Sequence, residues 1–129
     1  MSARLLLVDD LPFMRSLLAD IAKRAGWRVV AEAEHGRQAL AKYQIAKPDV
    51  VLLDIAMPEM DGITTLKRLK QLDRNARIVM CSALGEQAMI VRAISLGARD
   101  FVIKPFEEER VISAVTKVLE ADGLIDGKR

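Results

Sequence analysis

Each of four short apolar runs in this sequence ends in residues with charged or polar side chains. These residues are Asp9 with Asp10, Asp54, Ser82 and Lys104. Carboxylates are ligands for hard divalent cations, whereas an ammonium group and a hydroxyl group can stabilise the oxygens of a phosphoryl group. The set therefore has the chemistry of a site for a metal ion and a phosphate, provided that the fold brings its members together.

The three acidic residues predict the metal ion. Carboxylates that are crowded together raise one another's pKa values, and they stay ionised only if a cation joins them. Ligands that are all oxygen atoms suit Mg²⁺, which keeps several waters and takes few protein ligands. An acidic pair such as Asp9-Asp10 is usually a solvated loop when taken alone, and Ser82 and Lys104 taken singly are ordinary strand-end residues. The prediction therefore depends on the convergence of all of them.

Strands and helices alternate along the chain. Strands are predicted at residues 4–9, 27–33, 50–54, 77–82 and 100–104. Helices are predicted at residues 12–25, 36–46, 63–72, 86–96 and 107–121. Right-handed crossovers between successive strands give a parallel sheet with helices on both faces, which is a doubly wound α/β fold. The carboxyl ends of parallel strands share one edge, where such folds bind ligands, so the polar residues listed above are expected to meet there.

The segment at residues 50–54 organises this prediction. It follows Pro48, is rich in β-branched and aliphatic residues, and ends in Asp54, as expected for a strand that is buried on both faces. The segment at residues 27–33 is more polar, which predicts an edge strand. Cys81 lies inside an apolar run and is expected to be a small core residue.

Composition limits the function. The chain has 129 residues, which we assign to one domain at residues 1–121 and a polar, fraying tail at residues 122–129. The net charge of +2 argues against a nucleic-acid partner, and no apolar segment approaches membrane-spanning length. Without a secretory signal, a cytoplasmic location is the default expectation.

Several other site types are not supported. The sequence has neither a GxxxxGK[ST] nor a GxGxxG motif, so stable nucleotide binding is not expected. The single cysteine excludes an intramolecular disulfide and a cysteine zinc cluster. His35 has no neighbouring residue that would orient it as a base, and we expect it in a solvated loop.

Four segments resemble the receiver domain of two-component response regulators, in particular the stand-alone receivers of chemotaxis. They are Leu7-Val8-Asp9-Asp10, the stretch from Leu53 to Gly62 (LDIAMPEMDG), Cys81-Ser82-Ala83, and the stretch from Phe101 to Phe106 (FVIKPF). The resemblance covers nearly the whole chain. It implies a flavodoxin-like fold, five parallel strands in the order 2-1-3-4-5 and five helices; this strand order is carried over from the family.

The resemblance also implies roles for individual residues. Asp54 is the phosphoacceptor, and Mg²⁺ is held by Asp9, Asp10, Asp54 and the backbone carbonyl of Ala56. Lys104 contacts the phosphoryl group, and its bond to Pro105 is expected to be cis.

Ser82 is the switch hydroxyl and Phe101 the switch aromatic. Two residues depart from the usual family pattern. Ser82 stands where Thr is commoner, and Phe101 stands where Tyr is common, so Phe101 cannot form a phenolic hydrogen bond. In such receivers, the residues two positions after the acceptor and two after the switch hydroxyl often orient water; here they are Ala56 and Leu84.

The implied function is a signalling switch rather than a turnover enzyme, although the protein assists its own phosphorylation and dephosphorylation. The implied partners are a chemotaxis-type histidine kinase, an output protein such as a flagellar motor switch protein, and a phosphatase. We expect a monomer.

Three other functions remain open at this point. An aspartyl-nucleophile phosphohydrolase would carry an Asp-x-Asp motif after the first strand, where this chain has Asp9-Asp10-Leu11-Pro12. A flavodoxin-like cofactor binder is disfavoured because acidic residues after the first strand would repel a flavin phosphate. The chain could also be the receiver of a longer DNA-binding regulator or of another effector protein.

Overall fold

The structure is a computed structural model and describes residues 2–125. Its strands are β1 (Arg4–Val8), β2 (Arg28–Ala33), β3 (Val50–Asp54), β4 (Ile78–Ser82) and β5 (Asp100–Ile103). Its helices are α1 (Pro12–Arg24), α2 (Gly36–Ala46), α3 (Gly62–Leu72), α4 (Gln87–Ser95) and α5 (Glu108–Ala121). All ten predicted elements are therefore confirmed, with ends that differ by at most one residue.

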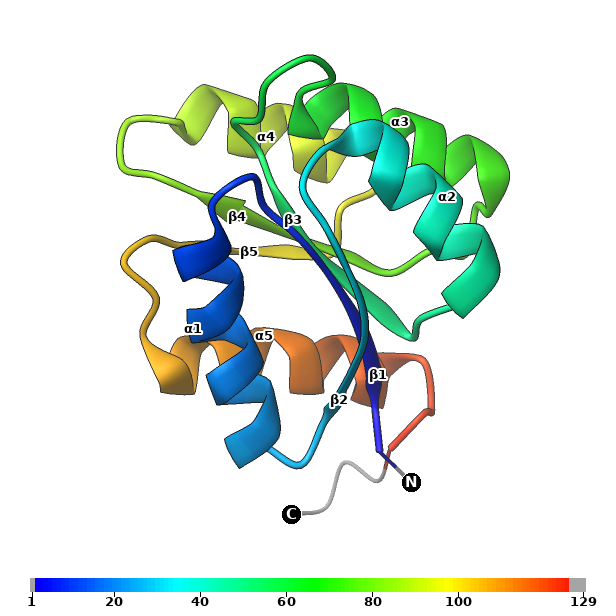
Figure 1. The fold of residues 1–129 in the computed structure, drawn as a ribbon, viewed down its shortest axis with the longest axis vertical. Helices are drawn as coiled ribbons and strands as arrows, with labels where there is room; N and C mark the ends of the chain where they lie inside the picture. The colour runs from blue at the N-terminus through cyan, green and yellow to red at the C-terminus, as the bar shows by residue number, and fades with distance from the viewer. Residues whose placement is uncertain (1, 126–129) are drawn as a thin grey trace.

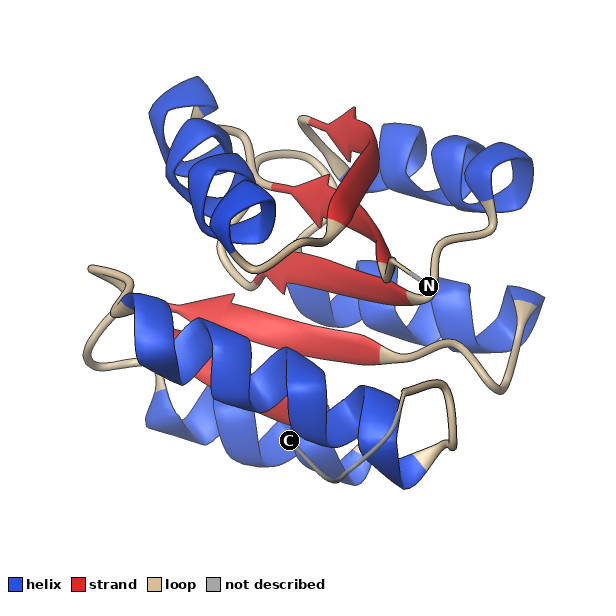
Figure 2. Cartoon of the chain, turned by 90° about the horizontal axis from the view of Figure 1, so that it is seen from below, coloured by secondary structure: helices blue, strands red, loops and turns tan. Residues whose placement is uncertain are grey.

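The strands form one parallel sheet in the order β2-β1-β3-β4-β5, which confirms the doubly wound α/β prediction. Helices α2, α3 and α4 cover one face, and α1 and α5 cover the other (Figure 1). Figure 2 shows the same layers along the sheet, with helices on both sides of the strands. Because each helix returns the chain antiparallel to its strand, the carboxyl ends of all five strands lie at one edge.

Side chains of the central strand alternate between two hydrophobic clusters. Val51 and Leu53 pack with α2, α3 and α4, whereas Val50 and Leu52 pack with α1 and α5. All four are at most 1% exposed, and burying each is worth roughly 1.5 to 3 kcal/mol. This confirms the prediction of a strand buried on both faces, and it fixes the position of Asp54, which ends the strand.

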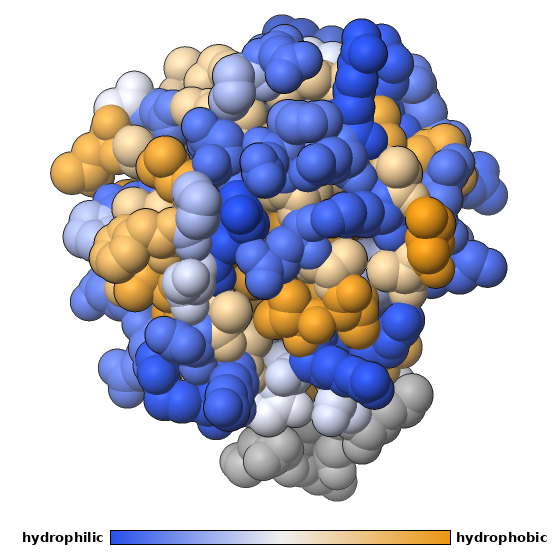
Figure 3. All heavy atoms as spheres, in the orientation of Figure 1, coloured by the Kyte–Doolittle hydropathy of each residue, from blue (hydrophilic) through white to orange (hydrophobic). Residues whose placement is uncertain are grey.

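The edge strands of the sheet are more exposed than its central strands. Strand β2 forms one edge, as predicted, and its Arg28 and Glu32 are exposed. At the other edge, Ile103 of β5 is 39% exposed. Figure 3 shows a mostly hydrophilic face that is interrupted by small apolar areas, one of them at the left, where Figure 1 places the loop between β4 and α4.

One local prediction needs correction. His35 is the N-cap of α2, where its Nδ1 accepts a hydrogen bond from the amide of Gln38 at 3.3 Å, so it is not a freely solvated loop residue. The fraying of the tail at residues 122–129 stays a prediction, and Asp122, its first residue, forms ion pairs with Arg77 and Arg99. Residues 126–129 of the predicted tail lie outside the described part of the chain. No helix within residues 2–125 is long and apolar enough to cross a membrane.

Candidate functional site

The sheet register brings the predicted site residues to one edge. Val8 of β1 pairs with Leu53 of β3, so Asp9 follows β1 beside Asp54. Ser82 ends β4, and the backbone amide of Lys104 donates to the Ser82 carbonyl at 2.8 Å. The strand ends that carry these residues lie toward the upper left of Figure 1. Residues from four separate segments thus meet, as the parallel topology predicted.

The three acidic residues form one cluster. Asp9, Asp10 and Asp54 each offer a carboxylate oxygen, and these oxygens all lie within 4.8 Å of one another. Asp9 is 1% exposed and Asp54 is 3% exposed, whereas Asp10 is half-buried. Because two of the three carboxylates have little water to screen them, their mutual repulsion is strong.

Lys104 lies between the two buried carboxylates. Its Nζ is 2.9 Å from Asp9 Oδ2 and 3.2 Å from Asp54 Oδ1. The Lys104–Pro105 peptide bond is cis, as the resemblance implied. A single ammonium group therefore serves two carboxylates, and the third, on Asp10, adds further negative charge to the cluster.

The two carboxylate oxygens of Asp9 have different environments. Oδ1 accepts a hydrogen bond from the Leu11 amide at 2.9 Å. Oδ2 is buried and, among the described residues, lacks a hydrogen-bond donor with suitable direction. Its contact with Lys104 is close enough for an ion pair but poorly aligned for a hydrogen bond. An oxygen with unused lone pairs in an acidic cluster is well suited to a metal cation.

The pKa of Asp54 is raised to about 6, chiefly by burial and then by the negative charge of Asp9, while Lys104 and the amide of Ala56 oppose the shift. Burial by itself would lower the pKa of Lys104, but its contacts with Asp9 and Asp54 outweigh burial and raise it. Lys104 is thus held in its charged form, and a cation bound at the cluster would further favour the ionised form of Asp54.

The loop after β3 is packed tightly against the acceptor strand. The amide of Gly62 donates to the Ile55 carbonyl at 2.7 Å, and a Cβ at Gly62 would lie 2.3 Å from the carbonyl oxygen of Asp54. Asp61 caps α3 by accepting from the Thr64 amide at 2.8 Å. Sequence reasoning treated Asp61-Gly62 only as a turn signal; an Asp directly before a helical segment could have indicated the cap.

A second supporting residue was also missed. Arg15 on α1 forms an ion pair with Glu32 at 2.9 Å, and its guanidinium donates to the backbone carbonyl of Asp9. These contacts connect α1, β2 and the start of the acidic loop. No motif marked Arg15, since its partner Glu32 lies on β2, 17 residues further along the chain.

An apolar pocket of about 300 Å³ lies between Ser82 and Phe101. Ser82 is 2% exposed, and Phe101 is half-buried and packs against the cluster beneath α2, α3 and α4. The pocket is completed by Leu84 and by Ile90 of α4. The two residues to which the resemblance assigns the switch therefore share a cavity into which a side chain could move.

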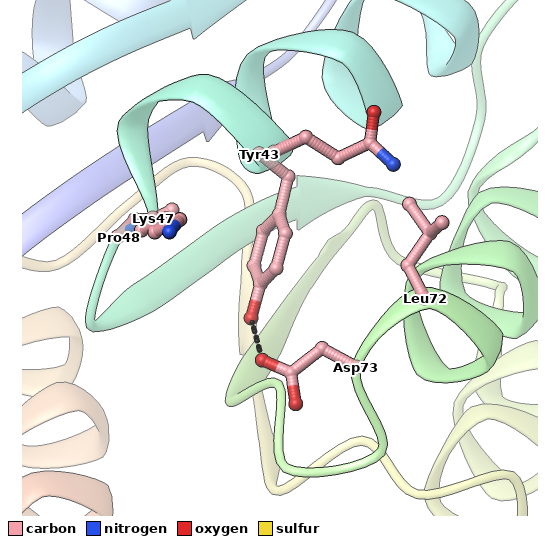
Figure 4. A pocket seen from close by; sticks show the side chains of 6 residues that line it. Tyr43, Lys47, Pro48, Leu72 and Asp73 are labelled. Carbon is pink, nitrogen blue, oxygen red and sulfur yellow. Dashed lines mark hydrogen bonds between the residues drawn. The ribbon is translucent and has the colours of Figure 1, made fainter.

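A different pocket, of about 540 Å³, lies away from this chemistry. Tyr43, Leu72 and Asp73 line it, and the Tyr43 hydroxyl donates to Asp73 at 2.7 Å (Figure 4). These residues come from the carboxyl ends of α2 and α3, at the opposite edge of the sheet from Asp54. Its size alone therefore does not make it the functional site.

Comparison with known proteins identifies the family. The sequence model of the response regulator receiver domain matches residues 5–116. The chain belongs to the response regulator receiver domain family. Receiver domains of this kind are phosphoacceptors and bind Mg²⁺ at an acidic pocket, and this receiver has such a cluster at the carboxyl edge of its sheet.

Two relatives and one solved structure indicate the branch of the family. The receiver is 55% identical over 119 residues to the chemotaxis protein CheY of Bacillus subtilis, covering 92% of this chain and 99% of the relative. It is 51% identical over 118 residues to CheY of Thermotoga maritima, covering 92% and 98%. The crystal structure of a CheX–CheY–BeF3–Mg complex from Borrelia burgdorferi matches with a TM-score of 0.87 and 36% identity, covering 91% of this chain and 89% of that chain.

These matches support a phosphorylation-activated signalling switch of the chemotaxis type. They do not favour the phosphohydrolase, and they do not favour the receiver of a DNA-binding or other effector protein.

Proposed function

We propose that this receiver accepts a phosphoryl group on Asp54 from a phosphohistidine of a chemotaxis-type histidine kinase and thereby changes its affinity for an output protein. One observation carries the proposal. The buried Asp54 carboxylate lies at the end of the central strand, 3.2 Å from the Lys104 ammonium and beside the carboxylates of Asp9 and Asp10.

Asp9, Asp10, Asp54 and the backbone carbonyl of Ala56 would hold Mg²⁺. The support comes from the crowded carboxylates and from the buried Asp9 Oδ2, which lacks a well-aligned hydrogen-bond donor among the described residues. When bound, Mg²⁺ supplies positive charge that stabilises the oxygens of the phosphoryl group during transfer.

In the proposed transfer, an ionised oxygen of Asp54 attacks the phosphorus atom in line with the departing imidazole. The new P–O bond forms as the P–N bond breaks, and the imidazole nitrogen of the kinase takes up a proton. Lys104 stabilises the phosphoryl oxygens as a fixed positive charge. Burial of Asp54 restricts access of water, so the aspartyl phosphate is protected from side reactions.

The resulting switch is local in origin. Phosphorylation adds a dianion with strong acceptor oxygens beside Lys104, and the hydroxyl of Ser82 moves to donate to it. That movement opens space for Phe101, which rotates into the pocket it shares with Ser82. The face formed by α4, β5 and α5 changes shape as a result, in a two-state shift.

Similarity to CheY proteins supports a chemotaxis-type kinase and a phosphatase as partners. A flagellar motor switch protein is the output partner that we propose. In the Borrelia burgdorferi complex, CheY is assembled with CheX in the presence of BeF3 and Mg. We place the protein in the cytoplasm as a monomer, without a nucleic-acid or membrane partner.

The decisive experiment is labelling with acetyl phosphate in the presence of Mg²⁺, followed by intact-mass spectrometry. The wild type should gain one phosphoryl group, Asp54→Asn should gain none, and the control Asp20→Asn, at an exposed position on α1, should behave as the wild type. Full labelling of Asp54→Asn would refute the assignment of the acceptor. A pull-down with and without beryllium fluoride then tests whether partner affinity follows the state of this site.

A further inference from the structure

A second charged pocket lies at the amino-terminal edge of β4 and β5, opposite the acidic cluster. Its volume is about 470 Å³. Its lining side chains come from the end of α3, the loop before β4, the residue before β5 and the residue after α5. They are Lys70, Arg74, Asn75, Ala76, Arg77, Arg99 and Asp122. Four cationic side chains thus surround a single carboxylate.

Internal contacts hold three of the cations in place. Arg77 donates to Asp122 Oδ2 at 2.6 Å, and Arg99 donates to both oxygens of Asp122 at 3.0 Å. Lys70 donates to the backbone carbonyls of Arg74 at 2.7 Å and Ala76 at 3.0 Å. A site whose donors are already ordered loses little side-chain entropy when a ligand binds.

The positive charge of the pocket exceeds what Asp122 neutralises. Both carboxylate oxygens of Asp122 accept hydrogen bonds from Arg77 and Arg99, whereas the described residues show no ion pair of Lys70 or Arg74 with Asp122. The guanidinium of the exposed Arg74 makes no ion pair within residues 2–125. The pKa of Lys70 is lowered, chiefly by burial and then by the neighbouring charge of Arg99, while the charges of Asp73 and Asp122 oppose the shift.

We propose that this pocket binds a small multivalent oxyanion of the phosphate class. The guanidinium groups of Arg77 and Arg99 have the planar arrangement of donors that suits such oxygens, and Lys70 and Arg74 add charge at the rim. No aromatic side chain lines the pocket, so a nucleobase would find no stacking partner. The ligand is recognised by its phosphate groups, whether these are free in solution or belong to a lipid headgroup.

Ligand binding and simple fold stabilisation make opposite predictions for Asp122. If the cations only anchor the end of α5, replacing Asp122 does no more than destabilise the protein. If they form an anion site, Asp122 competes with the ligand for Arg77 and Arg99. Asp122→Asn should then bind the anion more tightly even though the free protein is less stable.

The test is a titration of the full chain with inorganic pyrophosphate, at low ionic strength and with EDTA, by isothermal titration calorimetry. EDTA prevents metal-assisted phosphate binding at Asp54. In NMR spectra recorded during the same titration, the amide chemical shifts of residues 70–77 and 97–100 should change. We expect Arg74→Gln to weaken binding by about fivefold and Asp122→Asn to tighten it by at least about threefold, in line with the energies of exposed charge-assisted contacts. The matched control Arg68→Gln, on the exposed face of α3, should bind as the wild type.

Sedimentation with phosphatidylglycerol vesicles separates the two sources of phosphate. Binding of pyrophosphate without sedimentation supports a free anion, and sedimentation that Arg74→Gln weakens supports a headgroup at the same pocket. Absence of saturable binding to both probes would overturn the proposal. Three other results would also overturn it. They are amide chemical-shift changes confined to the residues around Asp54, an equal affinity of Arg74→Gln and wild type for pyrophosphate, and an affinity of Asp122→Asn that is no higher than that of the wild type.

Discussion

The ammonium nitrogen of Lys104 lies 2.9 Å from the buried Oδ2 of Asp9. The same nitrogen is 3.2 Å from Asp54. Lys104 is therefore both the expected ligand of the phosphoryl group and the internal counter-ion of the metal-free site. A metal ion bound to the carboxylates would take over the counter-ion role of Lys104.

Replacing Lys104 by Met should destabilise the metal-free protein by about 2 to 4 kcal/mol, because it leaves buried carboxylates without a counter-ion. Mg²⁺ should then stabilise the variant more than it stabilises the wild type. Urea unfolding with EDTA and with Mg²⁺ measures both effects, and Lys67→Met, at an exposed position on α3, is the control. An equal gain from Mg²⁺ in wild type and Lys104→Met would contradict this account.

The raised pKa of Asp54 predicts a pH dependence of stability. Its pKa is 3.8 in the unfolded chain and about 6 in the folded protein, so between these values the folded state binds more protons. Stability of the metal-free protein should therefore fall as pH rises through this window, and the cost persists at higher pH. At about pH 7.5, Asp54→Asn should be more stable than wild type by about 1 to 2 kcal/mol, a value reduced for solvent screening. Urea unfolding at several pH values, with Asp20→Asn as control, tests this; a variant that follows the wild-type pH profile would contradict it.

The fold was predictable because its signals are local. Apolar runs, helical spacing and the glycines after helices determined all ten elements, and the parallel topology brought Asp9, Asp54 and Lys104 together. Contacts between distant segments of the chain could not be predicted from the sequence. The ion pairs of Asp122 with Arg77 and Arg99 span 45 and 23 residues. No local pattern marks such partners, and for the same reason Arg15 was missed. His35 is a different case, because its N-cap hydrogen bond with the Gln38 amide is local.

The acidic cluster predicts a specific response to metal removal. Mg²⁺ should raise the melting temperature of the wild type by mass action, and EDTA should reverse the gain. Asp10→Ala should nearly remove this effect, since it deletes one of the three clustered carboxylates. Thermal unfolding at increasing Mg²⁺ concentrations measures it. If Asp10→Ala gained as much as the wild type, Asp10 would be a solvated loop residue.

Phe101 should couple phosphorylation to partner binding. Its ring is half-buried at the pocket shared with Ser82, and the guanidinium of Arg110 on α5 lies 5.6 Å from the ring centre. Phe101→Ala should leave labelling of Asp54 by acetyl phosphate intact but reduce the gain in partner affinity that phosphorylation produces. Affinity measured with and without beryllium fluoride gives this ratio. An unchanged ratio would make Phe101 an ordinary packing residue.

The lifetime of the phosphorylated state should depend on two apolar positions. Hydrolysis requires a water molecule that attacks the phosphorus in line, and a nearby polar side chain can hold that water. The residues two after Asp54 and two after Ser82 are Ala56 and Leu84, and neither has a polar side-chain atom. Leu84 is 76% exposed. The one carboxylate in the same loop, on Glu86, accepts a hydrogen bond from the Ala83 amide at 2.7 Å and is therefore already engaged.

We therefore expect slow self-dephosphorylation, with the signal ended mainly by a phosphatase or by back-transfer to the kinase. The double variant Ala56→Asn with Leu84→Glu should restore polar groups that orient water and should accelerate decay of the phosphorylated protein about tenfold, which corresponds to roughly 1.4 kcal/mol of barrier. The double variant Ala56→Val with Leu84→Met, which adds no polar group, is the control for altered packing. The decay rate is measured by mass spectrometry as the loss of the phosphoryl group, and it should be higher in the polar variant than in the apolar control. Equal rates in wild type and in the polar variant would mean that groups other than these two side chains position the attacking water.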